Sequence, residues 1–261
     1  MNELNQIKKR CLYTMLRLYK MANAGHTGAS LSCLDILVWL FFHIMKQEDK
    51  CILSKGHAAG ALYSTLAEAG KIPKEMLDSF YRDGTVLAAH PPCNGVIADI
   101  PFGTGSLGHG LSLATGFAFS QKYTGKKYHV YCIVSDGDCN EGSTWEAVMF
   151  AAQHKLNNLT LIVDYNQLQG FGYSSDVLDL KPIENKFRSF GFDTVIAQNG
   201  NNFNDLNLAF QQLSPHQPRC IIAQTVKGSG VSFMENKLEW HYLPMNDAQY
   251  QQAINEINHY A

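Results

Sequence analysis

The segment YHVYCIVSDGDCNEGSTWEAVMFAAQHKLNNLTLIVDYNQLQG, residues 128–170, combines two strand-like runs with a helical pattern between them. The runs at 128–134 and 159–165 are short and rich in β-branched and apolar residues, which predicts buried strands. Apolar residues at helical spacing over 141–155 predict a helix between them. A strand, a helix and a strand in this order predict two parallel strands joined by a crossover helix.

The rest of the chain continues this alternation. Further strands are expected at 193–197 and 219–226. Helices are expected at 4–21, 30–45, 56–70, 74–82, 106–123, 183–189, 202–213 and 247–258. This order predicts an α/β fold, a parallel sheet with helices on both faces. Because no repeat or low-complexity linker interrupts the sequence, residues 1–261 are expected to form a single domain.

Composition narrows the possible partners. The chain is 46% apolar with a net charge of −2, and it has no run of Lys or Arg, which argues against nucleic acid and membrane surfaces. The most hydrophobic stretch, 34–45, contains Asp35 and His43 and is too short to span a bilayer, so we expect a buried helix. Seven scattered cysteines without a CxxC pair argue against disulfides or a zinc site. Since the N-terminus lacks an apolar signal region, a cytoplasmic location is expected.

Polar residues follow two of the predicted strands. Asp136 ends the first and Asn166 ends the next, so both are expected at the carboxyl edge of the sheet, where ligands bind. A carboxylate, an amide oxygen and a backbone carbonyl suit Mg²⁺ or Ca²⁺. Gly137 permits close approach of a phosphate, and the N-terminus of the following helix favours an anion there. The alternative is structural: Asp138 and Asn140 cap the helix while Asp136 closes a turn.

Five blocks, in this order, resemble motifs of the N-terminal, thiamine diphosphate-binding half of transketolase. The similarity covers about residues 7–246, and the blocks are ANAGHTGAS (22–30), LSKGHAAGALYS (53–64), GTGSLGHGLSLATG (103–116), SDGDCNEG with NLTLIVDYNQLQGFG (135–142 and 158–172), and TVKGSGVSFMENKLEWH (225–241). The resemblance implies the diphosphate-binding domain of that family.

The resemblance also implies a cation and cofactor site. Asp136, Asn166 and the main-chain carbonyl of Leu168 would hold Mg²⁺ or Ca²⁺, and Gly137 would contact the diphosphate of thiamine diphosphate. Ser135 stands where the family has a glycine, so the local geometry of the diphosphate contact there is in question.

Further positions match residues around the organic part of the cofactor. Gly105 and Leu107 would flank its aminopyrimidine, and His57 and His241 would reach the diphosphate side of its thiazolium. Glu141 would belong to a carboxylate network near a subunit interface.

Histidines would also face the substrate. The resemblance implies that His26 and His90 contact the hydroxyls of the donor sugar, and we expect His26 and His241 to transfer protons. His109 replaces a residue that is commonly Gln in the family and is expected at a helix start, with contact to substrate left open.

The reaction implied is transfer of a two-carbon ketol unit from a ketose to an aldose. The chain stops at Ala261, before the pyrimidine-binding domain and the activating glutamate of full-length transketolases, so we expect a split enzyme in which a second, C-terminal subunit supplies both, as an α₂β₂ assembly. A relative that makes branched or modified sugars stays open, as does a non-catalytic cofactor-binding scaffold. A nucleotide-binding oxidoreductase is less consistent, because GTGSLGHG follows a loop and not a strand.

Overall fold

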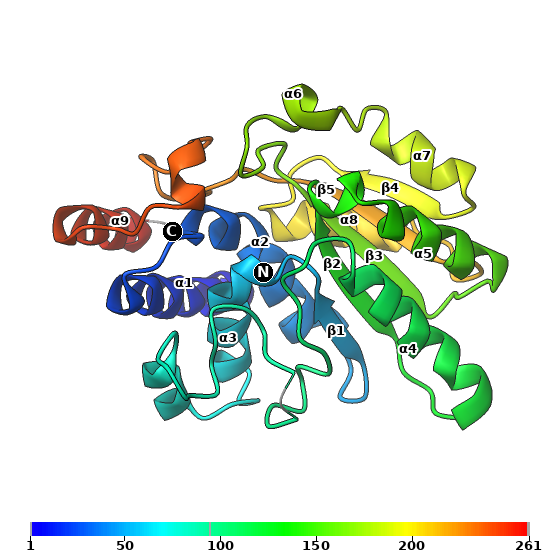
Figure 1. Ribbon diagram of the computed structural model, residues 1–261, viewed down its shortest axis with the longest axis horizontal. Helices are drawn as coiled ribbons and strands as arrows, with labels where there is room; N and C mark the ends of the chain where they lie inside the picture. Colours follow the sequence, from blue (N-terminus) through cyan, green and yellow to red (C-terminus); the bar gives the residue numbers. More distant parts are fainter. Residues whose placement is uncertain (1, 94, 260–261) are drawn as a thin grey trace.

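A five-stranded parallel sheet forms the centre of the molecule (Figure 1). The computed structural model describes residues 2–93 and 95–259. The strand order is β1-β2-β3-β5-β4, and every neighbouring pair is parallel. The strands are β1 (Lys50–Leu53), β2 (Val130–Ser135), β3 (Leu159–Tyr165), β4 (Asp193–Ala197) and β5 (Arg219–Gln224). The parallel α/β fold expected from the sequence is confirmed.

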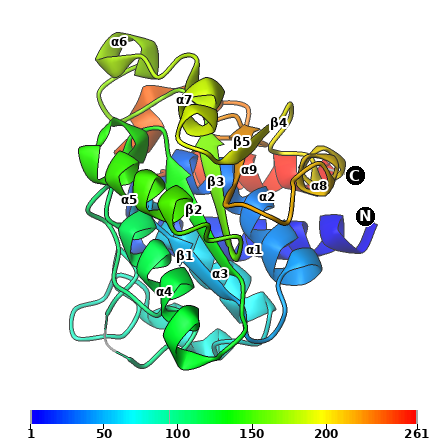
Figure 2. The same ribbon diagram turned by 90° about the vertical axis from the view of Figure 1, so that its right-hand side faces the viewer.

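Helices cover both faces of this sheet, as Figure 2 shows from the side. On one side of the sheet lie α2 (Thr27–Trp39), α3 (Ala59–Glu68) and α8 (Phe203–Gln211), and α1 (Asn2–Ala22) packs on α2 and α3. On the other side lie α4 (Gly110–Thr124), α5 (Gly142–Gln153) and α7 (Ile183–Ser189). Successive side chains of β2 alternate between two apolar cores: Ile133 belongs to one, and Cys132 and Val134 belong to the other. Both faces are therefore buried, which explains the continuous apolar runs of the strands.

The most apolar segment of the chain is a core helix. Every residue of α2 is buried, and the chain continues as a π-helical turn, η1 (Leu40–Ile44). Within the described residues one helix, Thr27–Ile44, is long and apolar enough to cross a membrane, and 78% of it is buried inside the fold. The expectation of a buried helix here is confirmed.

Several elements differ from the expectation. Strand β1 was not expected, because it is only four residues long and follows a charged stretch. The short helix α6 (Ser174–Leu178) was also missed, and residues 74–79 form a 3₁₀ helix, η3 (Lys74–Ser79). Helix α4 begins at Gly110 and not at 106, because Gly105 and Gly108 adopt φ of 139° and 81°, which a right-handed helix cannot contain.

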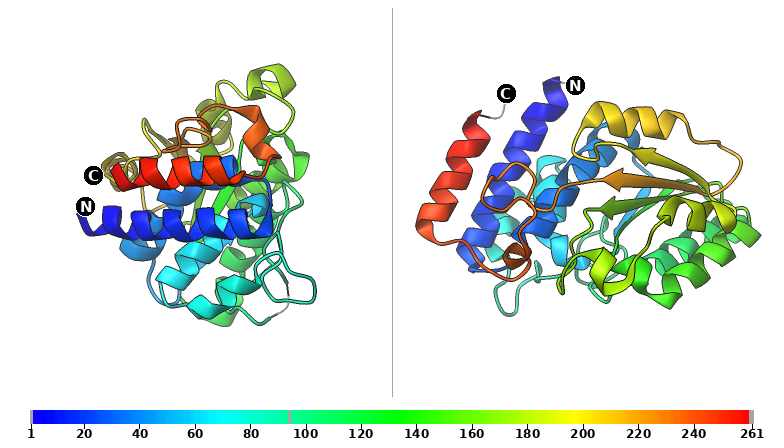
Figure 3. Two further views of the ribbon diagram at one scale, coloured as in Figure 1. Left: turned by 90° about the vertical axis from the view of Figure 1, so that its left-hand side faces the viewer. Right: turned by 90° about the horizontal axis from the view of Figure 1, so that it is seen from above.

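The C-terminal helix α9 (Asp247–His259) lies beside α1 at the outer surface (Figure 3). Lys20 at the end of α1 pairs with Asp247 at the start of α9 at 2.7 Å. The segment before α9, including the 3₁₀ helix η5 (Leu238–His241), carries the chain back from β5 across the carboxyl edge of the sheet. This return path places His241 near residues from the N-terminal half.

Candidate functional site

A pocket of about 240 Å³ opens at the carboxyl edge of the sheet. Residues singled out in the sequence line it together: His26, His57, His90, Gly105, Leu107, Ser135, Asp136, Gly137, Asn166, Leu168 and His241. Glu141 is not among them; it is exposed at the start of α5, beside Gly108. The topology therefore brings segments from most of the chain's length to one place.

The register of β2 and β3 explains why Asp136 and Asn166 meet. Ser135 pairs with Asp164 across the two strands, so Asp136 and Asn166 leave neighbouring strands at the same edge. They are 2% and 8% exposed. The expectation that both residues lie at one edge of the sheet is confirmed.

Their side chains present oxygen atoms. Asp136 Oδ2 accepts a hydrogen bond from Ser174 Oγ at 2.6 Å, and burial raises the pKa of this carboxyl while the Ser174 bond opposes the rise. Asn166 Oδ1 accepts from the Leu168 N–H at 3.1 Å. Among the described residues no group of three His, Cys, Asp or Glu side chains could hold a metal ion, so a cation at this place would also depend on the Asn166 amide and the Leu168 carbonyl. Such oxygen donors match the chemistry of Mg²⁺ and Ca²⁺.

The turn after β2 is built around Asp138. This carboxylate is fully buried: Oδ1 accepts from Ser54 Oγ (2.6 Å) and the Gly108 N–H (2.7 Å), and Oδ2 accepts from the N–H (2.8 Å) and Oγ (2.9 Å) of Ser135. The helix-cap alternative for Asp138 is thus wrong, since α5 has no side-chain cap and Asp138 instead ties β1, β2 and the loop before α4 together. Asn140 does not cap α5 either; it donates to the Leu178 carbonyl.

Ser135 and Gly137 contribute differently to this turn. The Ser135 hydroxyl is used inside the turn, where it donates to Asp138 and accepts from the Asp138 N–H at 3.2 Å. A Cβ at Gly137 would lie 3.0 Å from Leu107 Cδ1, closer than side chains normally pack. Glycine at 137 therefore keeps space between the turn and Leu107 that a phosphate group could use.

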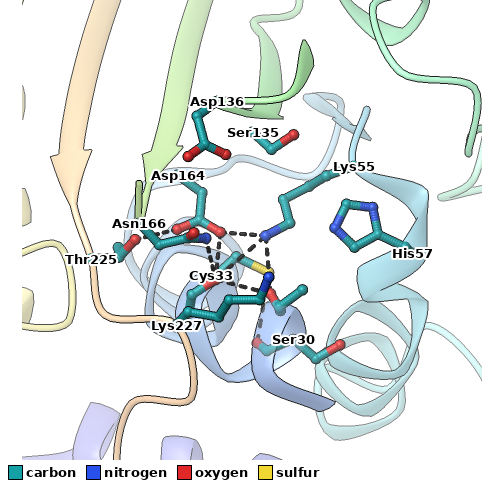
Figure 4. A network of polar contacts seen from close by, with 12 residues as sticks. Ser30, Cys33, Lys55, His57, Ser135, Asp136, Asp164, Asn166, Thr225 and Lys227 are labelled. Atoms are coloured by element: carbon teal, nitrogen blue, oxygen red, sulfur yellow. Dashed lines mark hydrogen bonds and ion pairs between the residues drawn. The ribbon is translucent and has the colours of Figure 1, made fainter. Parts of the chain in front are cut away.

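Beneath the pocket lies a polar network, defined as Ser32, Lys55, Asp164, Asn166 and Thr225; Figure 4 labels all of these except Ser32. Lys55 and Asp164 are both 0% exposed and form an ion pair. Asp164 also accepts from Thr225 Oγ1 and, at 2.6 Å, from Ser32 Oγ, while Lys55 donates to the Ala29 carbonyl at 2.9 Å. Burial alone lowers the pKa of Lys55, but the Asp164 carboxylate outweighs it and raises that pKa above its ordinary value.

A second lysine completes the pocket floor. Lys227 Nζ donates to the carbonyls of Leu168 (2.7 Å) and Gln169 (3.2 Å) and lies 3.0 Å from His241 Nδ1. Burial, with a smaller contribution from Lys55, lowers the pKa of Lys227 to about 8. Two ammonium groups in one pocket suit an anionic ligand such as a diphosphate.

Our sequence reasoning missed Lys55 and Lys227. A signal was present, because each lysine follows the end of a strand, β1 or β5, and directly precedes a glycine, Gly56 or Gly228. That is the position where parallel sheets bind phosphates.

Four residues lining the pocket form a histidine cluster, defined as His26, His57, His90 and His241. The His26 ring centroid lies 5.1 Å from that of His241, 5.4 Å from His57 and 6.0 Å from His90. Burial lowers the pKa of all four, to about 4 for His26 and about 3 for His241. The imidazoles are therefore uncharged near neutral pH, each with one donor and one acceptor nitrogen, and in His241 the acceptor Nδ1 already faces Lys227.

Local backbone geometry positions the histidine cluster. Gly105 has φ 139°, and a Cβ there would lie 2.8 Å from His90 Cδ2, so the loop passes His90 only because residue 105 is a glycine. The N–H of His26 donates to the His241 carbonyl at 3.1 Å. His109, whose role was left open, is exposed, does not line the pocket, and contacts the Leu107 carbonyl through Nδ1 at 3.2 Å.

Comparison with known proteins assigns the class. The family model described as "Transketolase, thiamine diphosphate binding domain" matches residues 8–258. The chain belongs to this family, which removes the oxidoreductase alternative.

Two relatives match nearly the whole chain. The chain is 37% identical over 252 residues to one of the subunits of the apulose-4-phosphate transketolase of Phocaeicola vulgatus, covering 92% of this chain and 88% of that protein. It is 36% identical over 267 residues to the 6-deoxy-6-sulfo-D-fructose transketolase subunit SqwG of a Clostridium species, covering 98% and 95%.

Full-length transketolases share the fold over part of their length. The chain is 37% identical to human transketolase over 246 residues, but it spans only 39% of that protein. The solved transketolase of Campylobacter jejuni superimposes with a TM-score of 0.89 at 28% identity and is covered to 43%.

Proposed function

We propose that this chain is the thiamine diphosphate-binding subunit of a split transketolase, which transfers a two-carbon ketol unit from a ketose to an aldose. The observation that carries the proposal is the pocket itself: residues Asp136, Asn166 and Leu168, which can present oxygens, line it together with two lysines and four uncharged histidines. This combination suits a cation, a diphosphate and a polyhydroxylated substrate side by side.

The cofactor proposal is thiamine diphosphate with Mg²⁺ or Ca²⁺. Asp136, Asn166 and the Leu168 carbonyl would hold the cation, and Gly137, Lys227 and His57 would bind the diphosphate end. When bound, the cofactor supplies the electron sink needed to break a bond beside a ketone. Gly105 and Leu107 line the pocket and would contact its aminopyrimidine.

The histidines would serve the substrate. His26 and His241, uncharged in this pocket, would accept and return protons at the substrate hydroxyl and carbonyl oxygens. His90, at the end of the 83–90 segment, would orient the sugar by hydrogen bonding. The His26 ring packs against the other three rings of the cluster.

A second protein chain is part of the proposal. It would supply the pyrimidine-binding domain and the activating glutamate, in an α₂β₂ assembly, with Glu141 facing the shared interface. The Phocaeicola and Clostridium relatives are both named as transketolase subunits, which supports a partner of this kind. Apolar side chains at the pocket mouth agree with a covering chain: Phe171 is 86% exposed and Tyr242 is 56% exposed.

The substrate class has a second candidate. Two relatives that match nearly the whole chain are named for apulose 4-phosphate and 6-deoxy-6-sulfo-D-fructose. Their names favour a branched or modified sugar over the sugar phosphates of a general transketolase. The scaffold alternative is less favoured, because a scaffold has no need of a buried carboxylate beside two pocket lysines.

Calorimetric titration tests the proposal. Thiamine diphosphate with Mg²⁺ should bind the full chain, and Asp136→Ala should weaken this binding strongly, whereas His109→Ala, outside the pocket, should not. Ketol transfer should appear only when the partner chain is added. Turnover by this chain alone would contradict the two-subunit proposal, and absence of cofactor binding with or without the partner would contradict the proposal as a whole.

A further inference from the structure

The Asn166 carboxamide can present either of two edges to the pocket, and only one of them carries an oxygen. Its Oδ1 and Nδ2 are similar in size, so steric fit alone does not choose between them. We propose that Ser32 is a positioning residue that directs the Asn166 oxygen toward Asp136 and the NH₂ group away from it. This inference rests on the proposed function for its consequence, but its geometry is independent of it.

The Ser32 hydroxyl has a single proton to donate. Two acceptors are in reach: Asp164 Oδ2 at 2.6 Å and the Ala29 carbonyl at 3.0 Å. Hydrogen bonds to a carboxylate are shorter and roughly twice as strong as those between neutral groups. The proton therefore points at Asp164.

Asp164 is a pure acceptor in this setting. Lys55, which can only donate, pairs with Oδ2, and the Thr225 hydroxyl donates to Oδ1 (Figure 4). Both Asp164 oxygens thus remain available to accept.

The direction of these hydrogen bonds then fixes the orientation of the Asn166 carboxamide. With its proton committed to Asp164, Ser32 Oγ offers only a lone pair, and the group 3.2 Å away must be the donor Nδ2 of Asn166. Oδ1 consequently points the other way, where it accepts from the Leu168 N–H at 3.1 Å. Ser32, itself 0% exposed and distant in sequence, sets which atom of Asn166 faces the cation site.

Ser32→Ala removes the acceptor and leaves the NH₂ group without a partner. We expect the affinity for Mg²⁺, measured by calorimetry on the full chain at saturating thiamine diphosphate, to fall about tenfold or more, the range found when groups that orient metal ligands are removed. Ser32→Thr, which keeps an Oγ, should restore most of the affinity.

A matched control is available on α3. Ser64 is 1% exposed, and its Oγ makes the same type of bond, to the Ala61 carbonyl three residues earlier at 2.9 Å. Ser64→Ala should leave the Mg²⁺ affinity unchanged. Equal losses in both alanine variants would overturn the positioning role, because they would report a general effect of removing a buried hydroxyl.

A second readout needs no ligand. In wild-type chain labelled with ¹⁵N-asparagine, the Asn166 NH₂ protons should show through-space NMR contacts to the β-protons of Ser32. Contacts to the Leu168 amide proton instead would overturn the inference, whether or not the cofactor binds. Unchanged Mg²⁺ affinity in Ser32→Ala would do the same. If wild-type chain binds no Mg²⁺ with thiamine diphosphate, the proposed function fails, while the NMR contacts still decide the orientation of Asn166.

Discussion

The polar network and the histidine cluster both border the pocket, yet they are held in opposite ways. The network is charged at its centre, and the polar atoms of Lys55 and Asp164 are engaged with protein groups. The cluster is uncharged, and in the described part of the chain the rings of His26, His57 and His90 contact other rings without a hydrogen bond to a protein group.

This difference separates two tasks. Lys55 and Asp164, whose hydrogen bonds are already satisfied by the protein, cannot be offered to a ligand without loss, so this pair serves to fix the pocket floor. Uncharged imidazoles with unused nitrogens can exchange protons and hydrogen bonds with a bound molecule. We therefore expect Lys55 and Asp164 to contribute stability and the histidines to carry the proposed proton transfer, at the same sheet edge.

The largest expected effect comes from breaking the network. Lys55→Met leaves the Asp164 carboxylate buried without its counter-charge, so we expect the free energy of unfolding to fall by about 3–5 kcal/mol. Urea denaturation at pH 7 measures this. The double variant Lys55→Met with Asp164→Asn should recover part of the loss, because it removes the remaining charge.

A surface pair provides the comparison for this variant. Lys74 is 70% exposed and lies 3.5 Å from Glu68, so Lys74→Met should change stability by less than about 1 kcal/mol. If Lys55→Met lowers the free energy of unfolding no more than Lys74→Met does, the buried pair does not stabilise the pocket floor, and the network and the cluster do not differ in this respect.

The sequence predicted which residues meet at the sheet edge, but not which side chains contact one another beneath the pocket. Asp136 and Asn166 were placed correctly, because alternating strands and helices determine which residues end on one sheet edge. Ser32 and Asp164 could not be found in this way. Their contact joins the middle of α2 to the end of β3, residues 132 positions apart, and depends on side-chain packing that no local pattern encodes.

Strand β1 and the role of Asp138 were not predicted correctly, for related reasons. Strand β1 is an edge strand of four residues, too short for a period to show, and its place in the sheet is set by pairing with β2. Asp138 matched the pattern of a helix cap, but tertiary contacts with Ser54 and Gly108 decide its role. Local rules therefore described the sheet well and the buried carboxylates poorly.

Acid should reduce stability through the histidine cluster. The pKa is about 4 for His26 and about 3 for His241 in the folded chain, against an ordinary value near 6.5. Between these values the unfolded chain binds protons that the folded chain does not. The free energy of unfolding should therefore fall as pH decreases from 6.5 toward 4, with no contribution from these groups above 6.5.

The window from pH 6.5 to 5 isolates this effect from most carboxylates. Urea midpoints should fall less steeply with acid in His26→Asn than in wild type, whereas His216→Asn, at an exposed site, should leave the slope unchanged. The fall in the free energy of unfolding of the wild-type chain over this pH range should stay below the loss caused by Lys55→Met, because the His26 ring keeps part of its solvent contact. An equal slope in wild type and His26→Asn would show that the cluster does not exclude protons.

The smallest expected effect concerns the backbone of the histidine cluster. His26 has φ 71° and ψ 10°, a left-handed conformation that costs a residue with a Cβ about 1 kcal/mol and costs glycine nothing. Both His26→Ala and His26→Gly lose the imidazole, so their difference in stability reports the backbone alone. We expect His26→Gly to be more stable than His26→Ala by about 1 kcal/mol in urea denaturation. At His109, where φ is −90°, the glycine variant should be no more stable than the alanine variant. If the glycine variant is the more stable one at both positions, the effect is a general one of glycine. If it is the more stable one only at His26, the fold accepts local strain to hold this ring in the pocket.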